Sequence, residues 1–412
     1  MKLSFSRFLT PGKLLLVPIC ISLAVWGIPG ESLYLRGFGH RADVNFGGVL
    51  LLLAFYTTVV LVAVSFAALG GTLVAGDGLV RARSAEVEKR FYLVVSLSGL
   101  VGVAAAYSAV GGSVSIVDAL STSSANVLSE HLADGSSLAT LRYATAMAAP
   151  AGLYLYRKRK VSLLSVIINC LLLTMNALLT SRLSLVMAIV IFFFLMAQEE
   201  SSKRIKPMGI AMAGLVIFVA LTILNFVRNG NYYRLFGVDN PIAMNLYQIM
   251  AYVGAPGQVS LGVASSIFNG KFANSVPAAS AVEAVTPTFL LGEKADKSAA
   301  TDPAIYGYNV DIAPNLNTNS AFADTYAKYG WWGLIAILLL LAVVSLLFGV
   351  FSRVGGVYAA GAGVIGYGFT EFWRLFLFSQ GISVFLILLT IGAAAIAMSS
   401  TLDITRRRNI KS

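Results

Sequence analysis

Long apolar stretches that are almost free of ionisable residues recur along this chain, and they constrain its fold more than any other feature. A window of about 20 apolar residues is long enough for a helix to cross a bilayer. Such spans lie at residues 14–29, 47–75, 91–110, 139–156, 161–180, 183–198, 208–227, 331–350, 355–370 and 380–400. The sequence therefore predicts an all-α, polytopic membrane protein with about ten transmembrane helices.

The composition supports this class. Of the 412 residues, 57% are hydrophobic and only 12% are charged, and the mean hydropathy is +0.79. A soluble core does not need this much apolar surface. Cys20 and Cys170 fall inside predicted spans, where we expect them to pack as small apolar residues rather than form a disulfide. The only histidines, His40 and His131, are far apart in sequence, so no Cys/His metal cluster is predicted.

Basic residues gather in alternate loops between the predicted spans. Most of the chain's 30 lysines and arginines lie near residues 2–13, 81–90, 157–160, 203–206, 353 and 406–411. Because Lys and Arg favour the cytoplasmic side of short loops, both termini are predicted to be cytoplasmic. The first span begins like a signal peptide but lacks a small-x-small cleavage site, so we expect it to be retained. The net charge of +11 follows from this bias, and nucleic-acid binding is not expected.

The same assignment divides the chain into three parts. Residues 1–227 form a bundle of about seven spans, 228–328 form a long outer loop, and 329–412 hold the last spans and a basic cytoplasmic tail. In the loop, 241–253 has the spacing of an amphipathic helix, and prolines from Pro256 onward are expected to break the rest into short pieces. A loop of this length is usually functional, and it can lie on the membrane as a lid.

Arginines stand at the outer ends of several predicted spans. These are Arg182 in a tight turn between two spans, Arg228 at the end of the next outward-going span, Arg234 just after it, and Arg374 at the end of the ninth span. An arginine near hydrocarbon is costly unless it is paired or hydrated, so several on one face indicate a common anionic partner. Guanidinium groups bind phosphate oxygens bidentately without a metal, which makes a lipid diphosphate the natural candidate.

A second interpretation of each arginine stays open. Any one of them alone can anchor a helix end or pair with a nearby acid such as Asp239 or Glu371. Arg182 and Arg228 taken together favour the anion site, because the positive-inside bias predicts few basic residues at outer ends.

A polar segment leads from the outer loop directly into an apolar span. In a helix, Asn317, Ser320 and Asp324 would share one face, with Asn319 on the neighbouring edge. The glycines of the following stretch 330–333 would let the chain turn or approach another backbone closely, and its two tryptophans suit a membrane interface. A capping residue and an ordinary Trp belt explain the segment equally well without chemistry.

In order and spacing these features resemble the O-antigen polymerase and O-antigen ligase superfamily of polytopic membrane glycosyltransferases. The likeness lies in Leu179-Thr-Ser-Arg182 between two spans, in Arg228 at the opening of a large outer loop, and in Gly330-x-x-Gly333. The resemblance implies a GT-C-like helical fold in the bacterial cytoplasmic (inner) membrane, with the large loop in the periplasm. It also implies undecaprenyl-diphosphate-linked sugars as substrates, and transfer that needs no metal or cofactor.

One departure separates the branches of this superfamily. Ligases typically carry a histidine shortly before the first glycine of the closing pattern, whereas Asn319-Ser320 stands there in this chain and the outer loop has no histidine. We therefore expect a polymerase that joins lipid-linked oligosaccharide repeat units at the periplasmic face. An O-antigen ligase, which transfers polymer to the lipid A core, is the nearer alternative.

The expected site combines a diphosphate clamp with a carboxylate that activates the acceptor. Arg182 and Arg228 would stabilise charge on the leaving diphosphate. Asp324 is the first choice to take the acceptor's proton, ahead of Glu371 and Asp239. The residues expected to bind sugar or phosphate are Arg234, Arg374, Asn317, Asn319, Ser320, Tyr326 and Glu371.

The expected partners are the polyprenyl-diphosphate-linked donor and acceptor, membrane lipid and a chain-length regulator protein. Two rivals from other classes stay open. A lipid-linked oligosaccharide flippase or transporter would share the spans, although ion-coupled carriers place charged residues or broken helices at mid-membrane, where this chain has few. The other rival is a membrane scaffold whose outer loop docks another protein.

Overall fold

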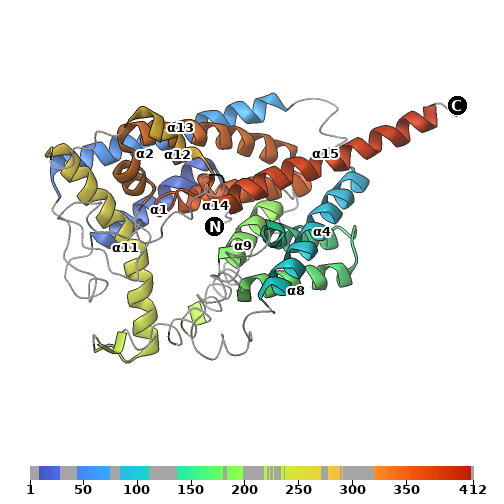
Figure 1. The fold of residues 1–412 in the computed structure, drawn as a ribbon, viewed down its shortest axis with the longest axis horizontal. Coiled ribbons are helices and arrows are strands. Elements are labelled where there is room, and N and C mark those ends of the chain that lie inside the picture. The colour runs from blue at the N-terminus through green and yellow to red at the C-terminus, as the bar shows by residue number, and fades with distance from the viewer. Residues whose placement is uncertain are drawn as a thin grey trace, which may run out of the picture.

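Every regular element that the structure describes is a helix (Figure 1). The computed structural model describes residues 9–27, 44–74, 84–110, 137–179, 183–197, 237–270, 277–287 and 320–409, with isolated positions at 218–219, 222, 226, 233–235 and 290. The α-helices are α1 (Pro11–Trp26), α2 (Phe46–Leu73), α4 (Ala85–Val110), α7 (Thr145–Arg157), α8 (Leu163–Leu179), α9 (Leu183–Ala197), α11 (Pro241–Phe268), α12 (Ala281–Val285), α13 (Ala321–Val354), α14 (Ala359–Glu371) and α15 (Gly381–Asn409). Short 3-10 helices are η2 (Ser137–Ala144), η3 (Ala278–Ser280), η7 (Gly356–Tyr358) and η8 (Leu377–Ser379). The all-helical class is confirmed for these residues.

Within these ranges, 4 helices are long and apolar enough to cross a membrane. They are Phe46–Leu73, Ala85–Ala109, Ala321–Val354 and Gly381–Ser399, and the shorter apolar helices are Pro11–Trp26, Leu163–Leu179 and Ser184–Ala197. All of these helices coincide with predicted spans, whereas most of the predicted span 208–227 lies outside the described residues. The membrane character of the chain is therefore supported, while the full number of spans, their orientation and the outer loop stay predictions.

The long helices α2 and α13 pack along each other in the same direction. Near their beginnings the rings of Phe55 and Phe322 lie 5.0 Å apart, and near their ends Gly70 lies against Leu346. A Cβ added at Gly70 would come within 2.0 Å of the Leu346 carbonyl oxygen. Small residues at such a crossing allow two backbones to approach closely, which is how apolar helices gain packing energy in a membrane.

We expect Gly70→Ala to destabilise the protein and the neighbouring Gly71→Ala to leave it intact. Overpacking at a backbone contact of this kind costs about 1–3 kcal/mol. A Cβ at Gly71 meets nothing within 4 Å, and alanine is intrinsically better than glycine inside a helix. Thermal unfolding of the two purified variants measures the difference, and equal melting temperatures would contradict the close approach of α2 and α13.

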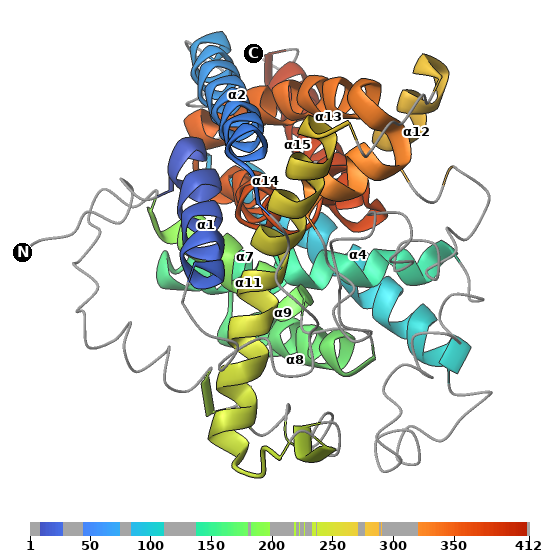
Figure 2. The same cartoon turned by 90° about the vertical axis from the view of Figure 1, so that its left-hand side faces the viewer.

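The helix α14 lies at the centre of the bundle (Figures 1 and 2). It is buried over almost its whole length, and its glycines admit neighbouring helices: a Cβ at Gly363 would lie 2.7 Å from the Cα of Ile191 on α9. The predicted span 355–370 is thus an inner helix enclosed by protein, and the predicted span 139–156 forms η2 and the buried α7. Hydropathy alone does not separate burial in protein from burial in lipid, because both surroundings are apolar.

The helix α11 corrects the prediction for the outer loop. The pattern predicts a helix over 241–253 that ends before Pro256, but α11 continues through this proline to Phe268. Its second half is buried against α1 and α2, and Ser22 of α1 donates a hydrogen bond from its Oγ to the Val253 carbonyl at 2.6 Å. These tertiary contacts offset the loss of the helix hydrogen bond that Pro256 cannot donate. Part of the predicted lid therefore belongs to the core, while η3 and α12 are the short pieces expected between prolines.

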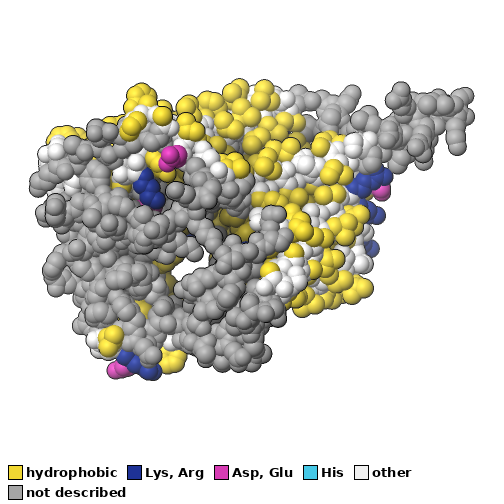
Figure 3. Space-filling model, in the orientation of Figure 1, with side chains coloured by type: hydrophobic (Ala, Val, Ile, Leu, Met, Phe, Trp, Pro, Cys, Tyr) yellow, Lys and Arg dark blue, Asp and Glu magenta, His cyan; other side chains and the backbone are white. Residues whose placement is uncertain are grey.

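Two basic clusters that the sequence assigns to the cytoplasmic side meet at one end of the bundle: residues 157–160 and the described part, 84–90, of the cluster at 81–90. Lys160 forms an ion pair with Glu88 near the beginning of α4, and only 2% of the Glu88 side chain is exposed. Figure 3 shows Lys and Arg side chains gathered at this end, to the right of a broad apolar surface. Their common location agrees with the predicted sidedness of these two loops.

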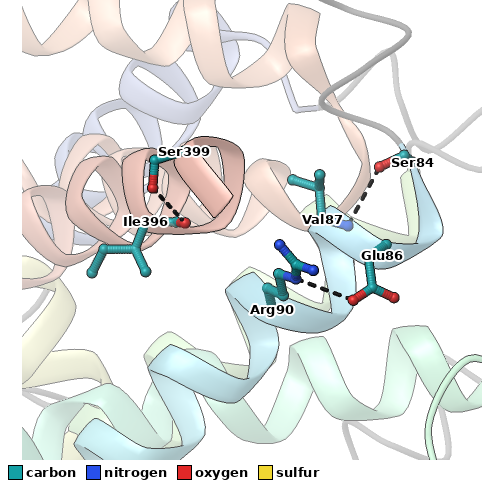
Figure 4. Close-up of polar contacts among 6 residues, drawn as sticks. All are labelled: Ser84, Glu86, Val87, Arg90, Ile396 and Ser399. Atoms are coloured by element: carbon teal, nitrogen blue, oxygen red, sulfur yellow. Dashed lines mark hydrogen bonds and ion pairs between the residues drawn. The ribbon is translucent and has the colours of Figure 1, made fainter. Parts of the chain in front are cut away.

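A second, exposed ion pair lies on the first turns of α4 (Figure 4). Ser84 caps the helix by accepting a hydrogen bond from the backbone N–H three residues on, and Glu86 pairs with Arg90 at 3.1 Å. The Arg90 side chain lies on the side of α4 that faces Ile396 and Ser399 of α15. The cap and the ion pair thus stabilise the polar first turns of α4, and the apolar part of the helix follows them.

Candidate functional site

The predicted site residues fall into two groups. Arg182, Arg228, Asn317 and Asn319 lie outside the described residues. Those that the structure describes are Arg234, Arg374, Glu371, Ser320, Asp324 and Tyr326.

Arg234 lies apart from the main core. Its side chain is exposed, and its guanidinium carbon lies 5.5 Å from the centre of the Phe226 ring. The residues beside it, Tyr233 and Val238, belong to a small hydrophobic cluster that is separate from the large central one. The described contacts of Arg234 therefore do not join it to the cluster around Arg374.

Arg374 is buried and has the acidic partner that the alternative interpretation named. Its Nε donates to Glu371 Oε2 at 2.8 Å, and its Nη2 lies 2.6 Å from the same oxygen. Its Nη1 donates to the hydroxyl of Tyr252 on α11, and its guanidinium carbon stacks 4.5 Å from the centre of that ring. The ion pair balances the charge of Arg374, so this arginine is a weaker candidate for a diphosphate clamp than the sequence indicates.

The electrostatic surroundings keep Arg374 charged. Burial by itself would lower the pKa of its guanidinium, but the carboxylate of Glu371 and the hydroxyl of Tyr252 act in the opposite direction, and the net pKa is raised. A charged arginine held by a carboxylate and an aromatic ring forms a rigid link between α11 and the end of α14.

The first turn of α13 corrects one detail of the predicted polar face. Ser320 is the N-cap of α13 and lies before the helix, where its buried Oγ accepts a hydrogen bond from the Ala323 N–H at 2.8 Å. It therefore has the capping role that the sequence allowed, and it does not share a helical face with Asp324. Asp324 is half-buried in that first turn, a favourable position for a carboxylate beside a helix N-terminus.

Tyr326 and the glycine pattern have structural roles in α13. Tyr326 is 3% exposed and meets Trp331 edge to face, with ring centroids 5.3 Å apart. Gly330 has φ 56° and ψ −149°, so α13 is kinked there by a conformation that favours glycine. The expected turn at this glycine is confirmed. The burial of Tyr326 indicates packing rather than sugar binding.

One aromatic contact brings the polar segment and the Arg374 segment together. Phe55 of α2 lies 5.0 Å from the ring of Phe322 and 6.4 Å from the ring of Phe372. Phe322 belongs to the first turn of α13, and Phe372 stands directly after Glu371. The two motifs that the sequence singled out separately are therefore neighbours across Phe55.

A buried arginine that the sequence interpretation missed lies in η2. Arg142 is 8% exposed. Its Nη1 donates to the Ala139 carbonyl at 2.6 Å, its Nη2 donates to the Tyr143 hydroxyl at 3.0 Å, and its guanidinium carbon lies 4.5 Å from the centre of the Tyr143 ring. No carboxylate in the described part of the chain pairs with it. Arg142 thus differs from Arg374 in having no carboxylate partner among the residues that the structure describes.

The free donors of Arg142 suit a phosphate group. A guanidinium has five N–H donors, and the described hydrogen bonds engage Nη1 and Nη2 once each, while the Nε is buried without an acceptor. An unsatisfied buried donor costs about 1–3 kcal/mol, which an anionic acceptor would relieve. Nε and Nη2 together form the planar fork that phosphate oxygens accept bidentately.

Arg142 lies against the end of α8 that precedes Arg182 in sequence. The Thr145 hydroxyl donates to the Arg142 carbonyl at 2.7 Å, and the Asn176 side chain donates to that same hydroxyl at 3.3 Å. Asn176 is in the last turn of α8, which ends at Leu179. The signal that could have identified Arg142 is its place near the predicted outer end of the span 139–156, the same signal that singled out Arg182.

An apolar cavity of about 310 Å³ lies between α1 and α2. Ile19, Leu23 and Tyr56 line this cavity and also a small hollow that reaches Trp373, the neighbour of Arg374. Because its lining is almost entirely apolar, the cavity suits a hydrocarbon chain.

No group of three or more His, Cys, Asp or Glu among the described residues could hold a metal ion. No protein-family model, no curated protein and no solved structure matches this chain.

Proposed function

We propose that this chain is a membrane glycosyltransferase that polymerises undecaprenyl-diphosphate-linked oligosaccharide repeat units at the periplasmic face. The observation that carries the proposal is Arg142, a buried guanidinium with an unused Nε donor and no carboxylate partner among the described residues. The motif order around Arg182, Arg228 and Gly330-x-x-Gly333, which resembles the O-antigen polymerases, supports it from the sequence.

In the proposed reaction the sugar–diphosphate bond breaks as the acceptor oxygen bonds to the anomeric carbon. Arg142, Arg182 and Arg228 bind the diphosphate, which leaves with the bonding electron pair and carries more negative charge in the transition state than in the substrate. Guanidinium groups that are already in position stabilise the transition state more than the ground state, and so lower the barrier. The apolar cavity between α1 and α2 is suited to an isoprenoid tail.

The acceptor is a sugar hydroxyl on a second lipid-linked unit, and its proton passes to a carboxylate. Asp324 is the better candidate base, because Glu371 is held by Arg374. Ser320 contributes by fixing the start of α13, and thereby the position of Asp324 one turn later.

Reconstitution of the purified full-length protein into liposomes with lipid-linked repeat units tests the activity. We expect polymer to form without a nucleotide or an ion gradient, and scrambling of lipid-linked units without polymer would instead support a flippase. In cells, a deletion strain that caps its lipid core with one repeat unit supports the polymerase. Free polymer beside a bare lipid core would support the ligase.

Arg182→Ala is expected to abolish long-chain glycan while the single-repeat product and the protein level stay unchanged. Loss of one donor to the developing charge lowers such rates by roughly 100- to 1,000-fold. Arg157→Ala is the matched control, since Arg157 is exposed and lies in a loop predicted to face the cytoplasm. Gel analysis of surface glycan measures chain length, and an unchanged length in Arg182→Ala would refute the clamp.

A further inference from the structure

A groove along α1, α2 and α13 combines an apolar wall with a cationic end. Its volume is about 650 Å³, and its apolar lining includes Leu16, Val64 and Phe348. Lys13 and Arg353 line the same groove, although they are far apart in sequence. Such a groove matches a molecule that has a hydrocarbon chain and an anionic head.

The charged residues that the structure describes as lining the groove, Lys13 and Arg353, are both basic. No Asp or Glu occurs among the described residues that line it. The N-terminus of α1 also lines it, from Thr10 onward, and Thr10 makes no side-chain capping hydrogen bond. The first N–H groups of a helix and its macrodipole favour an anion, and they add to the attraction of the two cations.

We propose that this groove binds one anionic phospholipid, with its phosphate at Lys13 and Arg353 and an acyl chain along Leu16 and Val64. Both cations belong to the basic residues that the sequence assigns to the cytoplasmic side, so the lipid comes from the cytoplasmic leaflet. The site anchors the start of α1 to the end of α13, and it is independent of the proposed transfer reaction.

The adjoining cavity offers a competing occupant. Leu16 and Val60 line both the groove and the apolar cavity between α1 and α2, so an isoprenoid tail could extend into the groove. The cationic end distinguishes the two. Ser22 of α1 lies in the hollow beside Trp373. Lys13 is nine residues before Ser22, which corresponds to about 14 Å along the helix. A phosphate held by Lys13 therefore belongs to a molecule whose head lies at the opposite end of α1 from Arg374.

Native mass spectrometry of the purified full-length protein with dioleoyl phosphatidylglycerol or dioleoyl phosphatidylcholine tests the site. We expect one phosphatidylglycerol to stay bound under conditions that strip phosphatidylcholine. Lys13→Ala and Arg353→Ala should each weaken its binding roughly fivefold, since a cation near anionic lipid contributes about that factor. Arg157→Ala with Lys158→Ala removes two positive charges, one more than either single variant, from exposed residues outside the groove and should leave binding unchanged.

A second pair of variants separates the groove from general surface charge. Ala68 is exposed and lines the groove, so Ala68→Trp should displace the lipid without changing any charge. Ala54→Trp places the same side chain at an exposed position of α2 that lines neither cavity, and should retain the lipid. Equal binding of the two phospholipids, equal loss in the control variants, or a retained polyprenyl phosphate in place of phospholipid would each overturn the proposal.

Discussion

Arg142→Met is expected to abolish polymer formation while the protein folds normally. If Arg142 holds the leaving diphosphate, its removal lowers the transfer rate by roughly 100- to 1,000-fold, which corresponds to about 2.7–4 kcal/mol of transition-state stabilisation. The measurement is the rate of polymer formation in liposomes, with single-repeat product followed in cells. Methionine keeps much of the side-chain volume, so η2 can still pack against α4, where a Cβ at Gly102 would lie 1.9 Å from the Arg142 backbone nitrogen.

The stability of the same variant distinguishes a functional role from a structural one. Arg142 is a buried cation with an unmet donor and, within the described ranges, no carboxylate partner; such a cation contributes little to folding, because its desolvation cost offsets its two hydrogen bonds. We therefore expect the free energy of unfolding of Arg142→Met to stay within about 1 kcal/mol of the parent. A large fall in melting temperature that parallels the loss of polymer would assign Arg142 to structure and remove it from the proposed clamp.

Two further substitutions refine the role of Arg142. Arg142→Lys keeps the charge but loses the planar fork, so part of the activity should return. Tyr143→Phe removes only the hydroxyl that accepts from Nη2, and it should change the rate far less than Arg142→Met. Equal activity of Arg142→Lys and Arg142→Met would show that charge at this position does not assist transfer.

Lys160→Ala is expected to destabilise the protein by about 3 kcal/mol, the lower end of the range for breaking a buried ion pair. The Glu88 side chain is only 2% exposed, so the substitution leaves its carboxylate buried without its partner. Lys160 is 22% exposed, so its removal lets some water reach the carboxylate, which keeps the loss at the lower end of the range. Gly356 lies against the same carboxylate, because a Cβ there would be 2.4 Å from Glu88 Oε1. Thermal and denaturant unfolding in detergent measure the loss.

Two controls test the physical reason for this loss. Glu86→Ala removes one partner of the exposed Glu86–Arg90 pair, where the Glu86 side chain is 62% exposed, and it should cost no more than about 0.5 kcal/mol. The double variant Glu88→Gln with Lys160→Met removes both charges together and should recover most of the stability. If the double variant is as unstable as Lys160→Ala, packing rather than an unpaired charge is responsible.

The features of the site that depend on neighbouring residues were predictable from the sequence. Glu371 and Arg374 are one helical turn apart, so their pairing follows from spacing alone, and the capping role of Ser320 likewise involves a residue three positions on. The partner of Arg374 on α11, Tyr252, is 122 residues away. The sequence contains no local pattern that relates these two residues, because their contact depends on how α11 packs.

What the sequence alone determined is the helical class and the approximate position of the apolar helices that the structure describes, because runs of apolar residues decide locally where a chain can form membrane-length helices. The tertiary structure decided which of these helices are enclosed by protein, since α14 and α2 are both apolar but α14 is buried over almost its whole length while α2 is not. It also decided that Arg374 has a carboxylate partner while Arg142, among the described residues, has none. Whether a charge is balanced depends on distances between segments far apart in the chain, and only packing sets those distances.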